Sequence, residues 1–174
     1  MTAPAASGIA PVVVFAIGNP SRGDDALGPE IYGRLAKWVE NQGLGDEVEL
    51  IEDFQLQIEH ALDLSGRSLA LFIDAGQQTS APFIFAPIQP STAITHTTHA
   101  LAPEAVLQVY RQTESRDPPP AFVLCVRGEA FELGAPLSPQ ALDYLEAACA
   151  LLRELCTQRE LGAWQSRVTA SRSG

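Results

Sequence analysis

The sequence predicts an α/β fold with a mostly parallel, five-stranded sheet that is covered by helices on both faces. Short apolar runs, typical of buried strands, alternate along the chain with segments whose apolar residues recur at helical spacing. Such alternation is typical of parallel sheets, whose strands are joined by helical crossovers. The length of 174 residues indicates one domain. Its two ends, 1–10 and 160–174, are expected to be flexible.

The first half of the chain is predicted to hold three strands and two helices. The run PVVVFAI is apolar throughout, as expected of a strand that is buried on both faces. From Leu27 to Trp38 the apolar residues recur every three or four positions, which predicts an amphipathic helix that NQGLGD ends. The strands are predicted over 11–17, 47–52 and 69–74, and the helices over 26–39 and 55–64.

The second half is predicted to hold two strands and two helices. Prolines flank the fourth strand and indicate an edge position, because proline cannot donate a hydrogen bond within a sheet. Ser138 and Pro139 suit the cap and the first turn of the last helix. The predicted strands cover 82–88 and 121–128, one helix covers 103–112, and the apolar stripe of the last helix comprises Leu142, Leu145, Cys149, Leu152 and Cys156.

Charge and cysteine content argue against several classes of function. The net charge of −10 disfavours nucleic acid and anionic membranes as partners. No apolar run approaches the ~18 residues of a membrane span, and no basic segment near the start indicates a secretory signal. Cys125, Cys149 and Cys156 are odd in number and form no C-x-x-C pair, so we expect reduced core residues. These features predict a cytoplasmic protein.

Three polar clusters follow predicted strands, and ligands of parallel sheets bind beyond the carboxyl ends of the strands. Asp24 and Asp25 follow the first strand, Asp74 ends the third, and His96 and His99 follow the fourth. Two carboxylates and an imidazole can hold a divalent cation or act as general acid and base. Each residue also has a structural interpretation: Asp24 as a helix cap, Asp74 as a turn former, and the histidines as solvated loop residues.

Several common catalytic motifs are missing. GNPSRG lacks the spacing of G-x-G-x-x-G, and acidic residues stand where a P-loop would have lysine and serine or threonine. The acidic pair would repel a phosphate at the start of the helix that follows. The sequence also lacks G-x-S-x-G and H-E-x-x-H. Phosphate binding, a nucleophile elbow and a zincin site are therefore disfavoured.

Three segments resemble the hydrogenase maturation endopeptidases, which process the large subunit of nickel–iron hydrogenases. GNPSRGDDALG matches the family pattern G-N-x-x-x-x-D-(D or E)-x-x-G in full. The shorter segments FIDA and THALAPEAVL follow in the family's order, and the resemblance covers roughly 11–156. DFQLQIEHALDL resembles the subgroup that serves cytoplasmic, NAD-reducing hydrogenases.

The resemblance implies an α/β/α sandwich with a cation site of three ligands. Carried over by motif, these ligands are Asp25, Asp74 and His99. His99 is preferred to His96 because it begins the segment that resembles the family's histidine followed by a helix. The chain departs from the family at Ala100, where the family usually has glutamine. That departure leaves the choice between the two histidines open.

The family also implies how the rest of the site works. Gly18, Asn19, Asp24 and Gly28 would support it, with Asp24 starting the helix while Asp25 points into the cleft. Because asparagine also caps helices well, Asp24→Asn is expected to lower the stability of the fold by less than the ~1 kcal/mol that loss of a cap removes. No cofactor is permanently bound, since the nickel belongs to the substrate. No catalytic residue is assigned.

The leading functional hypothesis is a monomeric, nickel-dependent endopeptidase. Its partner would be a nickel-loaded hydrogenase large-subunit precursor, from which it removes a C-terminal extension. A non-catalytic nickel-sensing module or nickel chaperone that acts on the same precursor is the first alternative. An unrelated α/β hydrolase of small molecules is the second. Cleavage of the precursor, binding without cleavage, and turnover of a small ester distinguish the three.

Overall fold

The computed structural model describes residues 8–92 and 101–169, and within them all the expected strands and helices form. The strands are β1 (Val12–Ile17), β2 (Val48–Asp53), β3 (Leu69–Gly76), β4 (Phe83–Ile88) and β5 (Ala121–Arg127). The α-helices are α1 (Leu27–Asn41), α2 (Pro103–Glu114), α3 (Pro139–Thr157) and α4 (Leu161–Gln165), and the 3-10 helices are η1 (Gly23–Ala26) and η2 (Ile58–Leu64).

The strands form a single mixed sheet in the order β2-β1-β3-β5-β4. The pairings of β1 with β2, β1 with β3 and β3 with β5 are parallel, whereas β4 runs antiparallel to β5. The link 77–82 between β3 and β4 is too short for a helical crossover, so the chain returns in the opposite direction. The expectation of a mostly parallel sheet is therefore only partly met. The edge position of β4 is confirmed.

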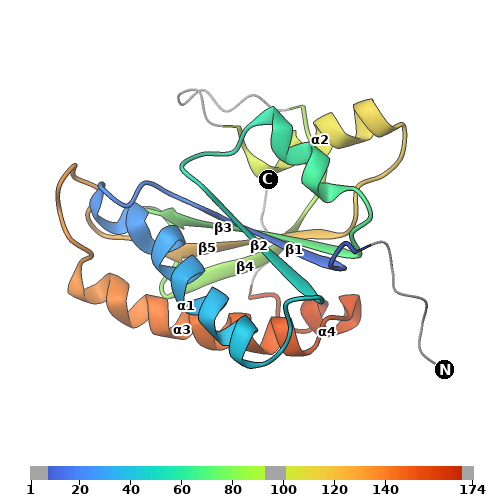
Figure 1. Ribbon diagram of the computed structural model, residues 1–174. Coiled ribbons are helices and arrows are strands. Elements are labelled where there is room, and N and C mark those ends of the chain that lie inside the picture. Colours follow the sequence, from blue (N-terminus) through green and yellow to red (C-terminus); the bar gives the residue numbers. More distant parts are fainter. Residues whose placement is uncertain (1–7, 93–100, 170–174) are drawn as a thin grey trace.

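Helices cover both faces of the sheet and make three layers (Figure 1). Alternate residues of each strand point to opposite faces. On one face, Val14, Leu71 and Leu124 join a buried cluster with residues of α1 and α3. On the other, Phe15 and Phe72 stack at a ring-centroid distance of 4.8 Å within a cluster that includes residues of η2 and α2. The sandwich expected from the resemblance is thus present.

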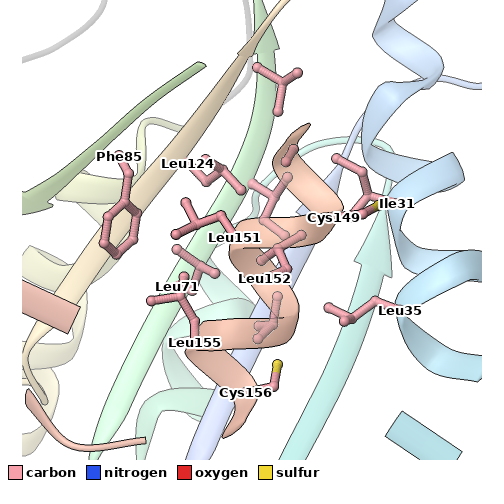
Figure 2. Packing of buried hydrophobic residues seen from close by; sticks show 14 of the residues in the cluster. Ile31, Leu35, Leu71, Phe85, Leu124, Cys149, Leu151, Leu152, Leu155 and Cys156 are labelled. Carbon is pink, nitrogen blue, oxygen red and sulfur yellow. The ribbon is translucent and has the colours of Figure 1, made fainter. Parts of the chain in front are cut away.

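Two of the three cysteines lie in the core, as expected, whereas Cys125 on β5 is only half-buried. Cys149 and Cys156 on α3 belong to the cluster that α1 completes, where Ile31 and Leu35 also lie (Figure 2). Burial raises the pKa of the Cys149 thiol and raises that of Cys156 to about 12, so neither is an effective nucleophile. Leu142, expected in the same stripe, is instead 44% exposed.

The chain beyond residue 160 forms α4 and packs on the sheet as far as residue 169, which corrects the expectation of a flexible tail for this part; 1–7 and 170–174 lie outside the described residues. Trp164 of α4 is buried and packs edge-on against Phe85 and Phe122. Its indole N–H donates to the carbonyl of Leu155, and the backbone N–H of Thr169 donates to the carbonyl of Phe85. No helix within the described parts of the chain is long and apolar enough to cross a membrane.

Candidate functional site

The strand order creates a topological switch point between β1 and β3. The chain leaves β1 toward β2 on one side, and β3 pairs with β1 on the other side. Ligands of open α/β sheets bind outside the carboxyl ends of strands at such a point. Asp25 follows β1 by way of a short loop, and Asp74 lies near the carboxyl end of β3. The structure therefore brings both predicted acidic ligands to the same edge of the sheet.

The loop after β1 holds Asp25 in place through its backbone. The N–H of Asn19 donates to Oδ2 of Asp25 over 2.8 Å, and the Asn19 side chain accepts from the N–H of Ser21 over 2.9 Å. The N–H of Gly18 donates to the carbonyl of Asp53, which ties the loop to the end of β2. Asp25 is half-buried, so its carboxylate is anchored and still reaches solvent.

Two glycines of the motif allow the start of α1 to lie against the end of β1. A Cβ atom at Gly18 would collide with the carbonyl oxygen of Asp25. A Cβ atom at Gly28 would collide with the carbonyl oxygen of Ile17. Both are backbone contacts and cannot be relieved by a rotamer change. We therefore expect any larger residue at either position to displace Asp25 from the sheet edge.

Asp24 does not cap the helix that follows it, contrary to the expectation from sequence. η1 begins without a side-chain cap, and Asp24 is fully buried with its carboxylate turned toward the connection between β5 and α3. Its Oδ2 accepts from the N–H groups of Glu129 and Ala130 and from the hydroxyl of Ser138, and its Oδ1 accepts from the N–H of Ser138. Asp24 therefore joins two segments that are more than a hundred residues apart.

These hydrogen bonds decide the ionisation of Asp24. Burial alone would raise the pKa of the carboxyl, but the bonds from Ser138, Glu129 and Ala130 outweigh burial, and the pKa lies below its ordinary value of 3.8. The carboxylate is thus ionised in its buried position. Asparagine would place an amide N–H₂ against some of these donors. The structure therefore predicts a larger effect of Asp24→Asn than the capping interpretation did.

Asp74 lies on the face of the sheet that α2 covers. Asp74 pairs in register with Cys125. Val123, two residues before Cys125 and so on the same face of the sheet, belongs to the cluster with α2 and η2. The side chain of Asp74 is exposed to solvent, although neighbouring protein atoms partly desolvate its carboxyl group. Desolvation is the main cause that raises the pKa of Asp74 to about 7. A hydrogen bond from the N–H of Ala75 lowers this pKa, and repulsion by Asp25 raises it further. The two carboxylates are therefore close enough to interact.

This interaction gives a first prediction. Replacing Asp25 by asparagine should lower the pKa of Asp74 below about 7, because one cause of the increase is removed, while desolvation keeps it above 3.8. Because folding raises the pKa of Asp74, protonated Asp74 contributes to the free energy of unfolding. That contribution is complete below pH 3.8 and is lost as the pH rises through about 7. Carboxyl-carbon NMR titrations of both proteins measure the shift. An unchanged titration midpoint would mean that the two groups do not interact.

The structure does not test the predicted histidine ligand. His96 and His99 lie outside the described residues, so the third ligand stays a prediction. The next described helix, α2, lies on the same face of the sheet as Asp74. Within 8–92 and 101–169, no three His, Cys, Asp or Glu residues are grouped so that they could hold a metal ion. The described residues thus supply two carboxylates to the candidate site.

A histidine–aspartate pair that was not predicted from the sequence lies at the same edge. His60 of η2 is buried, its Nδ1 accepts from the N–H of Gln57 over 2.8 Å, and its Nε2 lies 3.3 Å from Oδ2 of Asp53. Because Nδ1 accepts, the ring proton is on Nε2 and points toward Asp53. Asp53 ends β2, so the rule that located Asp25 and Asp74 would have found it as well.

The fold was compared with known proteins. No protein-family model matches the sequence, and no curated protein matches it. Solved structures do match. The hydrogenase maturating endopeptidase HybD from E. coli has a TM-score of 0.67 and 22% identity over 87% of this chain and 93% of its own. The NiFe hydrogenase maturation protease HycI from Thermococcus kodakarensis KOD1 has a TM-score of 0.63 and 22% identity over 87% and 95%.

A third structure extends the likeness to another organism. The hydrogenase 2 maturation peptidase from Thaumarchaeota archaeon SCGC_AB-539-E09 has a TM-score of 0.59 and 19% identity, over 84% of this chain and 97% of its own. All three matches span nearly the full length of the solved proteins, so the likeness covers the whole domain and not a shared substructure. The chain therefore has the fold of the hydrogenase maturation proteases.

Proposed function

We propose that this chain is an endopeptidase that removes the C-terminal extension of a nickel–iron hydrogenase large-subunit precursor, and that cleavage depends on nickel in the precursor. The observation that supports the proposal is that Asp25, in the loop after β1, and Asp74, near the end of β3, follow the two neighbouring strands of the switch point. Each comes from a motif that resembles the maturation endopeptidases, and solved structures with this fold bear that name. His99 is proposed as the third ligand.

The chemistry of the proposed ligands suits inspection of a metal that belongs to another protein. Carboxylates and one imidazole, without a thiolate, hold a borderline divalent ion without gripping it tightly. A precursor could present its nickel to Asp25 and Asp74 and afterwards withdraw it. The reaction adds water across one peptide bond and releases the tail as a free peptide. Nickel either polarises the scissile carbonyl or positions the chain, and both roles require the ligands to be ionised.

Loose binding of this kind leads to a prediction about metal content. The purified protein should contain no stoichiometric metal, and treating it alone with a chelator should leave its activity intact. Precursor that lacks nickel should not be cleaved, whatever metal is first added to the enzyme. Elemental analysis and a cleavage assay test these outcomes. One tightly bound metal per chain, with activity lost on its removal, would indicate an ordinary metallopeptidase instead.

The deciding experiment is incubation with purified, nickel-loaded large-subunit precursor. Loss of mass at the C-terminus of the precursor, seen by mass spectrometry, supports the proposal. Binding without cleavage would identify a nickel-sensing module, and turnover of a small ester without a protein partner would identify a different hydrolase. DFQLQIEHALDL adds the proposal of a cytoplasmic, NAD-reducing type of target, which precursors of several hydrogenase types would test in parallel. The enzyme is proposed to act as a monomer.

A further inference from the structure

Residues 54–62, here named the apolar edge segment, expose three large apolar side chains. Phe54, Ile58 and Leu62 are 68%, 60% and 73% exposed. The same segment also contributes Leu56 and Ala61 to the buried cluster beneath η2 and α2. The core contact is thus made by other residues, and the three exposed side chains add nothing to it. Large apolar side chains that stay exposed within one short segment are candidates for an interaction site.

The exposure is built into the folded structure. The N–H of Gln57 donates to Nδ1 of His60, and the N–H of His60 donates to the carbonyl of Gln57 over 3.0 Å. This reciprocal pair fixes the start of η2, and buried Leu64 fixes its end. The side chains of Ile58 and Leu62 are therefore held outward by a backbone that is already ordered. A partner would bind them without first ordering the segment.

The apolar edge segment adjoins the candidate site. It begins directly after Asp53, which pairs in register with Ile17 at the end of β1. The N–H of Gly18 donates to the carbonyl of Asp53 over 3.1 Å, and the next residue, Asn19, holds the carboxylate of Asp25. A large protein that reaches Asp25 from outside the sheet edge therefore lies beside Phe54. A short peptide that reaches Asp25 alone does not need this surface.

The charge around the segment indicates the chemistry of its occupant. From 38 to 66 the chain contains no lysine or arginine. Such a run favours a partner that brings apolar side chains flanked by lysine or arginine. The acidic residues in the segment or directly before it are Glu52, Asp53 and Glu59, and Asp63 follows it; Glu40, Asp46 and Glu47 lie at the other end of β2, and Glu49 pairs with Arg67.

We propose that the apolar edge segment is the docking surface for the body of the precursor, which presents an apolar patch with basic residues around it. This inference rests on the proposed function and adds where the substrate is held. Phe54, Ile58 and Leu62 bind the folded part of the precursor, and Asp25 and Asp74 receive its metal. Docking then determines affinity for the precursor, whereas the carboxylates determine cleavage.

The test compares Ile58→Ser/Leu62→Ser with the wild-type protein, using purified nickel-loaded precursor. The KM for the precursor should rise about tenfold or more, because the variant removes two central anchors of the docking surface at once, while kcat stays unchanged. Affinity measured by biolayer interferometry should fall by the same factor. Leu142→Ser, an exposed leucine on α3, is the matched control and should change neither. Glu59→Lys should also weaken binding, most clearly at low salt.

Several results would overturn the inference. They are an unchanged KM in the double variant, a fall in kcat alone, or an equal effect of Leu142→Ser. Wild-type protein that sediments as a dimer, with the double variant as a monomer, would assign the segment to a second copy of the chain. Precursor that binds through the segment but is never cleaved would contradict the proposed function and leave the docking surface standing. Wild-type protein that fails to bind the precursor would contradict the docking surface directly.

Discussion

Replacing Asp25 by asparagine is expected to abolish cleavage of the precursor while the fold survives. Asparagine keeps the shape of the side chain and one oxygen that can accept from the N–H of Asn19, as Oδ2 of Asp25 does over 2.8 Å. It removes the negative charge that a cation requires from its ligand. Loss of a residue that only hydrogen-bonds a metal ligand commonly lowers metal affinity or activity 10–100-fold. Loss of a ligand itself should therefore lower the rate of cleavage more than about a hundredfold.

The matched control is Glu30→Gln, which removes an equal charge from the exposed first turn of α1. It should retain wild-type cleavage, which separates loss of a ligand from loss of charge near the site. Melting curves of both variants should overlap that of the wild-type protein. The measurement is the initial rate of precursor cleavage at saturating substrate. A fully active Asp25→Asn protein would remove Asp25 from the ligand set.

That Asp25 and Asp74 come to the same edge of the sheet could be predicted from sequence, because the prediction needed only local patterns. Apolar runs located the strands, helical spacing located the crossovers, and the carboxyl-edge rule then selected the loops. The order β2-β1-β3 was not predicted, yet it strengthens the inference, since it puts the switch point between the two strands in question. Had the same rule been applied to β2, it would also have located Asp53.

The features that were missed depend on contacts between distant parts of the chain. Nothing near Asp24 in the sequence indicates that its partners are Glu129, Ala130 and Ser138. Trp164 likewise lies in a short, polar-looking segment, and its packing on Phe85 and Phe122 together with its hydrogen bond to Leu155 holds α4 in place. In both cases tertiary contacts override the local preference of the chain. Local rules predict caps and frayed ends well only where no such contact exists.

The second large effect is expected at Asp24, where asparagine should destabilise the fold by roughly 2–4 kcal/mol. The two carboxylate oxygens accept four hydrogen bonds, and asparagine offers one oxygen. If its amide nitrogen replaces Oδ1, it faces the N–H of Ser138. If it replaces Oδ2, it faces three donors. In either orientation a buried donor loses its acceptor and meets another donor.

The pH dependence of this loss identifies its cause. Folding lowers the pKa of Asp24 below 3.8, so the ionised carboxylate stabilises the fold above that pH, and the stabilisation is lost as the pH falls through the lowered pKa. Urea unfolding should therefore show a large gap between wild-type and Asp24→Asn proteins at pH 7 that narrows in acid. Asp25→Asn, one position along, should show little gap at either pH. A difference below about 0.5 kcal/mol at pH 7 would mean that Asp24 does not hold the connection between β5 and α3 to the start of α1.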